Sequence, residues 1–98
     1  MIEYPTDEEL DLIESWDYND FKGLMLVIED LWSYPDYFSV EVGKSFINKK
    51  VLKYDISTGG WSGNEDIIAA MMDNTMFWSL CWEESRRGGH YKFEVKNE

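Results

Sequence analysis

The sequence predicts an α+β fold in which a small antiparallel sheet of about three strands packs against helices, in the order α-α-β-β-α(α)-β. Two patterns support this prediction. Apolar residues recur at helical spacing in the first third of the chain, and they alternate with polar residues in three later segments. A chain of 98 residues with 44% hydrophobic residues has the usual size and composition of one domain, so we expect a single domain over residues 1–98.

Two helices are predicted at the start of the chain. Thr6 and Glu9 have the spacing of a capping box, which favours a first helix from about Asp7 to Trp16. Asn19 is expected to cap a second helix. Pro35 biases Tyr34 away from helical backbone angles, so this helix should end near Ser33. Its apolar residues at helical spacing are Phe21, Leu24, Met25, Ile28, Leu31 and Trp32.

A β-hairpin is expected next. Phe38, Val40 and Val42 alternate with polar residues and are predicted to face the core. The turn is either Gly43-Lys44 or Asn48-Lys49. A second strand follows at about residues 50–57, with Leu52, Tyr54 and Ile56 facing inward.

The last third is predicted to contain helix and then strand. Ser62 and Glu65 repeat the capping-box spacing, and Thr75 is expected to cap a further helical stretch, either as one kinked helix or as a second helix. The basic and glycine residues at 85–89 are typical of a helix C-terminus. A final strand is expected where Tyr91, Phe93 and Val95 alternate with polar residues.

The negative charge of the chain is concentrated near its start. The whole sequence has a net charge of -11, and residues 1–36 alone contain eleven acids and one base. Phosphate contacts favour Lys and Arg, so this composition argues against direct binding of nucleic acid or of an anionic membrane. The expected partner is a protein with a basic surface.

The first helix carries the leading candidate site. Asp7, Asp11 and Glu14 lie at i, i+4 and i+7, with Glu8 and Glu3 nearby, and such a row of carboxylates can imitate backbone phosphates. This pattern predicts a DNA-mimic inhibitor that occupies a nucleic-acid-binding protein. The alternative is a solvated helix face that keeps a small protein soluble.

Two glycine-rich segments form an alternative ligand site, at residues 58–65 and 85–91. The first lacks the lysine and the spacing of a P-loop, but backbone N–H groups at a helix start can hold an anion. Aromatic rings and arginines together suit a nucleotide or another anionic small molecule. The candidate residues are Trp61, Asn64, Arg86, Arg87, His90 and Tyr91. The structural alternative is a tight turn at the first segment and a helix C-cap at the second.

Catalysis is not expected. His90 is the sole histidine and Cys81 the sole cysteine, so neither a multi-histidine metal site nor an intramolecular disulfide is available. Cys81 lies on a predicted helix, where burial would keep its thiol inert. We therefore expect a non-enzymatic protein without cofactor or metal. No long apolar run or signal-peptide pattern is present, which favours a cytoplasmic location.

The last 40 or so residues carry a resemblance. Thr58-Gly59-Gly60-Trp61-Ser62-Gly63-Asn64-Glu65 and Ser85-Arg86-Arg87-Gly88-Gly89-His90-Tyr91 resemble segments of small uncharacterised proteins encoded by bacteriophages and prophages. The resemblance implies a bacterial or phage cytoplasm. Together with the acidic first helix, it leads us to expect a phage-type accessory protein with a counter-defence role, whose partner is a host protein with a basic surface. The resemblance implies no activity, and the acidic first third lies outside it.

Overall fold

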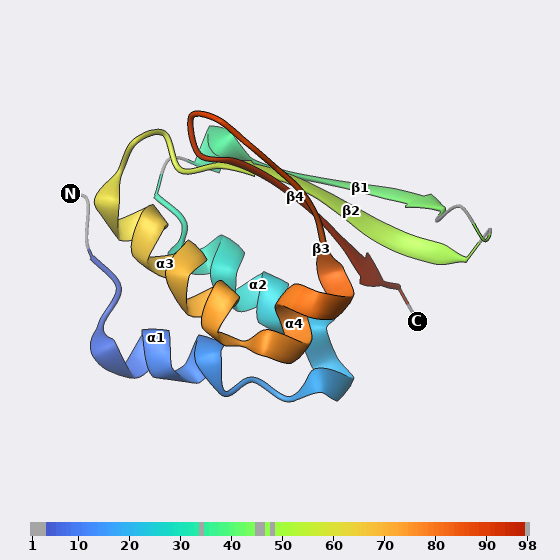
Figure 1. Cartoon of the computed structure of the whole chain (residues 1–98), viewed down its shortest axis with the longest axis horizontal. Coiled ribbons are helices and arrows are strands. Elements are labelled where there is room, and N and C mark those ends of the chain that lie inside the picture. Colours follow the sequence, from blue (N-terminus) through green and yellow to red (C-terminus); the bar gives the residue numbers. More distant parts are fainter. Residues whose placement is uncertain (1–3, 34, 45–46, 48, 98) are drawn as a thin grey trace.

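The computed structural model describes residues 4–33, 35–44, 47 and 49–97 of the chain. Two helices come first, a hairpin and two more helices follow, and two further strands end the fold (Figure 1). The α-helices are α1 (Asp7–Glu14), α2 (Phe21–Leu31), α3 (Ser62–Asp73) and α4 (Thr75–Cys81), and the strands are β1 (Phe38–Lys44), β2 (Lys50–Ser57), β3 (Trp82–Arg86) and β4 (His90–Lys96). Short 3-10 turns, Tyr18–Asp20 and Pro35–Tyr37, precede α2 and β1.

The four strands form one antiparallel sheet in the order β1-β2-β4-β3. Figure 1 shows all four helices on one face of this sheet, so the other face is open. The α+β class predicted from the sequence is thus confirmed, and the sheet has four strands where about three were expected. The expected hairpin is β1–β2, and β2 has the predicted bounds.

The additional strand, β3, lies where helix and C-cap were predicted. Phe77, Leu80 and Cys81 keep a helical spacing, but α4 ends at Cys81, and Trp82 already has extended backbone angles. β3 pairs with β4, and a turn joins them in which Gly88 and Gly89 have positive φ angles of 86° and 78°. The glycines at 88 and 89 therefore form a strand-to-strand turn and not a helix C-terminus.

The first two helices are capped by short polar side chains. The Thr6–Glu9 capping box is present, and α1 ends at Glu14, two residues earlier than predicted. The cap of α2 is Asp20 and not Asn19, because the Asp20 carboxylate accepts a hydrogen bond from the Gly23 N–H at 3.2 Å. Tyr34, which the proline was expected to bias, lies outside the described residues.

The caps of α3 and α4 differ from the prediction. Ser62 is the first residue of α3 and its hydroxyl bonds Tyr4, so no capping box forms with Glu65. Asn74, and not Thr75, caps α4, and its side chain accepts a hydrogen bond from the Phe77 N–H at 3.2 Å. The helical stretch is therefore two helices.

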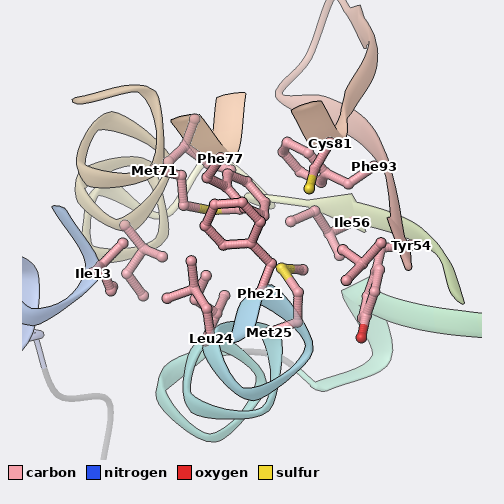
Figure 2. Close-up of a cluster of buried hydrophobic side chains, with 14 of the residues drawn as sticks. Ile13, Phe21, Leu24, Met25, Tyr54, Ile56, Met71, Phe77, Cys81 and Phe93 are labelled. Carbon is pink, nitrogen blue, oxygen red and sulfur yellow. The ribbon is translucent and has the colours of Figure 1, made fainter. Parts of the chain in front are cut away.

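The core lies between the helices and the inner face of the sheet (Figure 2). Phe77 of α4 is fully buried between Phe21 of α2, at 5.2 Å between ring centroids, and Phe93 of β4, at 5.4 Å. Burying each of these large side chains contributes about 1.5–3 kcal/mol. Phe77 therefore connects the helical layer to the sheet.

The hairpin extends past the helices (Figure 1). Phe38 is buried, as are Tyr54 and Ile56 on β2, but Val40 is 43% exposed and Val42 is 74% exposed. The predicted alternation of β1 is present, and yet its outer half has no core above it. β1 continues through Gly43-Lys44, so that pair is not the turn, and Asn48 of the other candidate lies outside the described residues.

Candidate functional site

The carboxylates of α1 point away from the core. Ile13 is fully buried, and Leu10 and Trp16 pack beside it on the inner side of the helix. Glu9 is used internally, because its carboxylate accepts the Thr6 N–H at 2.8 Å. The four predicted site residues on this helix are all exposed: Asp7, Glu8, Asp11 and Glu14.

α3 lies beside α1 and runs in the same direction (Figure 1). At their starts, the Tyr4 and Ser62 hydroxyls are hydrogen-bonded at 3.0 Å. At their ends, the Asn74 amide donates to the carbonyl oxygens of Ile13 and Trp16 at 3.0 Å and 3.3 Å. The two helices are thus held together at both ends.

This alignment places Asp73 of α3 beside Glu14 of α1. The pKa of the Glu14 carboxyl is raised above its ordinary value, first because neighbouring atoms remove part of its hydration and then because the Asp73 and Asp11 carboxylates lie next to it. Asp73 thus extends the acidic row onto a second helix. We call Asp7, Glu8, Asp11, Glu14 and Asp73 the acidic surface.

Basic side chains do not neutralise this surface within the part of the chain that the structure describes. The ion pairs that join described residues are Arg86–Glu84 and Lys92–Asp55, the latter at 3.9 Å, and both lie on the sheet. Lys22 on α2 donates a hydrogen bond to the Asn97 side chain at 2.9 Å. Glu3, which was expected to add to the acidic row, lies outside the described residues.

The two glycine segments meet at one end of the sheet. Ser57 pairs with His90, and the Thr58 N–H donates to the Gly89 carbonyl at 3.0 Å. Gly89 has a φ of 78°, and a Cβ there would lie 2.3 Å from the Thr58 hydroxyl. Only glycine suits this close approach.

The six alternative site residues are nevertheless separated. Asn64 is fully buried, bonds the Ser33 backbone N–H and C=O at 2.9 Å each, and donates to the Thr58 carbonyl. Trp61 packs on Tyr4 with 4.7 Å between ring centroids. Both therefore hold the fold together at the helix side of the sheet.

The other four alternative residues lie on or near β4. Tyr91 shares the inner face of β4 with Phe93 and packs on Trp78, whereas His90 is exposed and alternates to the open face. Arg86 pairs with Glu84, and Arg87 is exposed in the turn. The strand alternation thus places the imidazole and the Tyr91 ring on opposite faces of the sheet.

A shallow groove of about 480 Å³ crosses the open face of the sheet and includes none of the six residues. The charged residues of its lining are five acids and two bases: Glu41, Lys53, Asp55, Glu83, Glu84, Lys92 and Glu94. The pKa of Glu94 is raised, mainly because its carboxyl is hydrogen-bonded to Glu83. The pKa of Glu84 is lowered, mainly by its hydrogen bond from Arg86. The Glu84 charge is thus balanced by Arg86, whereas the Glu83 and Glu94 carboxyls lie next to each other.

The nucleophile that the sequence offers is unreactive here. Cys81 is buried, and burial raises the pKa of its thiol to about 12, so it stays protonated at neutral pH. Among residues 4–33, 35–44, 47 and 49–97, no three His, Cys, Asp or Glu side chains are grouped as metal ligands.

Sequence reasoning found the four α1 carboxylates and missed Asp73. A signal for it was present, because residues 62–81 contain three acids and no base. The described helices include none that is long and apolar enough to cross a membrane. Comparisons with models of protein families, with curated proteins and with solved structures gave no match.

Proposed function

We propose that the chain is a non-enzymatic accessory protein of the phage type that binds and inhibits a basic, nucleic-acid-binding host protein through the acidic surface. The observation that supports this most is the alignment of Glu14 with Asp73, which joins the carboxylates of two helices without a basic neighbour among the described residues. A role in counter-defence in the bacterial cytoplasm agrees with the phage resemblance and belongs to the same proposal.

The physical basis is electrostatic complementarity. Clustered carboxylates attract Lys and Arg side chains over a distance of about 8 Å at physiological ionic strength, and over longer distances at low salt. A partner cation next to Glu14 would also remove the repulsion between Glu14 and Asp73. Binding should therefore be weakened by salt and by protonation of the carboxylates.

The test is capture from bacterial lysate by the full chain, at low and at high salt. Changing Asp7→Asn, Asp11→Asn and Glu14→Gln together should abolish capture of a basic protein, because three charges disappear from exposed positions. Asp73→Asn alone should weaken capture. Release of bound nucleic acid from the captured protein would identify the inhibitory step.

The matched control removes three charges from the sheet, by Glu41→Gln, Glu83→Gln and Glu94→Gln. This variant has the same net charge as the first one, and it should capture as well as the unchanged protein. Equal losses in both variants would mean that net charge alone drives binding. Capture that survives the α1 changes would refute the proposal.

A second function is favoured by one observation, the contact between Thr58 and Gly89 that joins the two glycine segments. A nucleotide bound at this end of the sheet would contact Arg87 and His90 on the exposed side, whereas Trp61 and Tyr91 pack on the helix side. At 100 times its dissociation constant such a ligand stabilises the fold by about 2.7 kcal/mol, or at least about 10 °C in Tm. A thermal-shift panel of nucleotides without any such rise would remove this alternative.

A further inference from the structure

The two edges of the sheet differ in how well they are protected. β3 is a five-residue strand with charged residues, and its pairing with β4 shifts register between Trp82 and Glu84. Bulges, charges and short length are the usual devices that prevent an edge from pairing with another chain. β3 has all three.

β1 is the less protected edge, because it has one acid and one base but neither a bulge nor a short length. It is seven residues long and pairs with β2 in continuous register from Phe38 to Lys44. It is the first strand in the sheet order, and within the described part of the chain β2 is the strand that pairs with it. Val42 is 74% exposed and Val40 is 43% exposed, on the same face as the buried Phe38 but beyond the helices that cover it. Such an edge is suited to accept one more strand.

We propose that β1 pairs antiparallel with β1 of a second copy of this chain, giving an eight-stranded sheet across a two-fold axis at Val40. In this register Val40 faces Val40 of the second copy, and Phe38 faces its Val42. Ser39 then faces the second copy's Glu41, so no like charges are opposed. A shift of the axis to Glu41 would oppose two carboxylates, which is destabilising.

Charge also favours a second copy at this edge. The helices carry the net negative charge, so two copies repel each other wherever helices approach. β1 contains one acid, Glu41, and one base, Lys44, and is electrically neutral. The isologous contact that a two-fold axis requires is therefore available at β1 without direct repulsion at the interface.

Native mass spectrometry and sedimentation of the full chain, at rising protein concentration, test the assembly. We expect a species of twice the 11.6 kDa mass of the chain. Val42→Lys should give monomer at every concentration, and the unchanged circular dichroism expected for an exposed position would show that it folds. Monomer alone for the unchanged protein, at the highest concentration it reaches, would overturn the proposal.

The matched control is Ser39→Lys, which adds the same charge to the same strand on the opposite face. It should keep the dimer or strengthen it, because the new lysine faces the second copy's Glu41. If Ser39→Lys and Val42→Lys reduced the dimer fraction equally, the proposed contact between valines would be refuted.

The register is tested by disulfide trapping. Val40→Cys should cross-link two copies rapidly, because the two residues are directly opposed, whereas Val42→Cys faces Phe38 and should not. The native Cys81 is buried, so the unchanged protein should not cross-link and serves as the control. Faster cross-linking of the Val42→Cys variant would refute this register.

Salt separates this inference from the proposed function. Raising the salt from about 0.01 M to about 0.15 M shortens the Debye length from about 30 Å to about 8 Å, which screens the repulsion between the two helical layers. The dimer should become more populated, whereas capture of a basic partner should decline. A dimer that dissociates as salt is added would contradict the apolar contact, whatever the capture experiment shows.

Discussion

The helical layer and the rest of the chain have different electrical characters. Residues 7–33 and 62–81, which form the helical layer, contain twelve acids and one base, whereas the sheet, its loops and the termini contain eight of each. The whole net charge of -11 is thus carried by the helices. The helices can therefore attract a cationic partner, while the sheet can approach a second copy. One small fold thereby offers surfaces for two kinds of contact.

The largest loss of stability is expected from a change in the core that joins the helices to the sheet. Phe77→Ala removes the ring between Phe21 and Phe93 and should cost about 3–5 kcal/mol, out of a total stability of about 5–15 kcal/mol for a typical domain. Urea unfolding measures the loss. Met76→Ala is the neighbouring control, because Met76 is 49% exposed, and it should change stability by less than about 0.5 kcal/mol. Similar losses in both would contradict this packing.

The second-largest loss of stability is expected at Asn74, whose side chain links α1 to α4. Asn74→Ala removes the cap of α4 and the two hydrogen bonds donated to α1, so we expect a loss of about 1–3 kcal/mol. Proteolysis or hydrogen exchange should show that α1 opens more readily. Thr75→Ala changes the exposed neighbour and should stay within about 0.5 kcal/mol. An Asn74 variant with unchanged protection of α1 would contradict the link.

The smallest changes in Tm are expected for two surface carboxylates, Glu14 in the helical layer and Glu84 in the sheet. The two changes should have opposite signs. The pKa of Glu14 is raised in the folded protein, so its charge is a penalty that is present at neutral pH and disappears as the pH falls toward the ordinary value of 4.5. Glu14→Gln should therefore raise Tm at pH 7, and its advantage should shrink as the solution is acidified. A Glu14→Gln protein that melts lower than the unchanged protein at pH 7 would exclude the repulsion from Asp73.

Glu84 on β3 is the residue to compare with Glu14, because its pKa is shifted in the opposite direction. The pKa of Glu84 is lowered by Arg86, so its charge stabilises the fold above pH 4.5, and the contribution is lost as the pH falls through the lowered pKa. Glu84→Gln should slightly lower Tm at pH 7 and have no effect in strong acid. Thermal melts at pH 7, 5 and 3 measure both variants, and shifts of the same sign would contradict the difference between the layers.

Local signals in the sequence predicted most of the elements. The Thr6 capping box, the apolar spacing of α2 and the alternation of β2 are all present where the sequence placed them. β3 was missed because Trp82 continues the helical spacing of α4, and its pairing with β4 outweighs this local preference. Ser62 and Thr75 were misassigned as caps because the residue before each takes the cap position.

The candidate sites were predicted only in part. The four α1 carboxylates follow from helical spacing, and the structure places them on an exposed face. The two glycine segments of the alternative site do meet, but the separation of His90 from Tyr91 onto opposite faces follows from the register of β4 with β2. Sequence order alone also gave no reason for the exposure of Val40 and Val42.

The sequence by itself determined the helix starts that have a capping residue, the alternation of the strands and the excess of acids at its beginning, because each depends on residues close together in the chain. Only the tertiary structure decided that Asp73 lies beside Glu14, that β3 protects one edge, and that β1 extends beyond the helices. These features depend on packing between segments far apart in sequence, and no local preference encodes that packing.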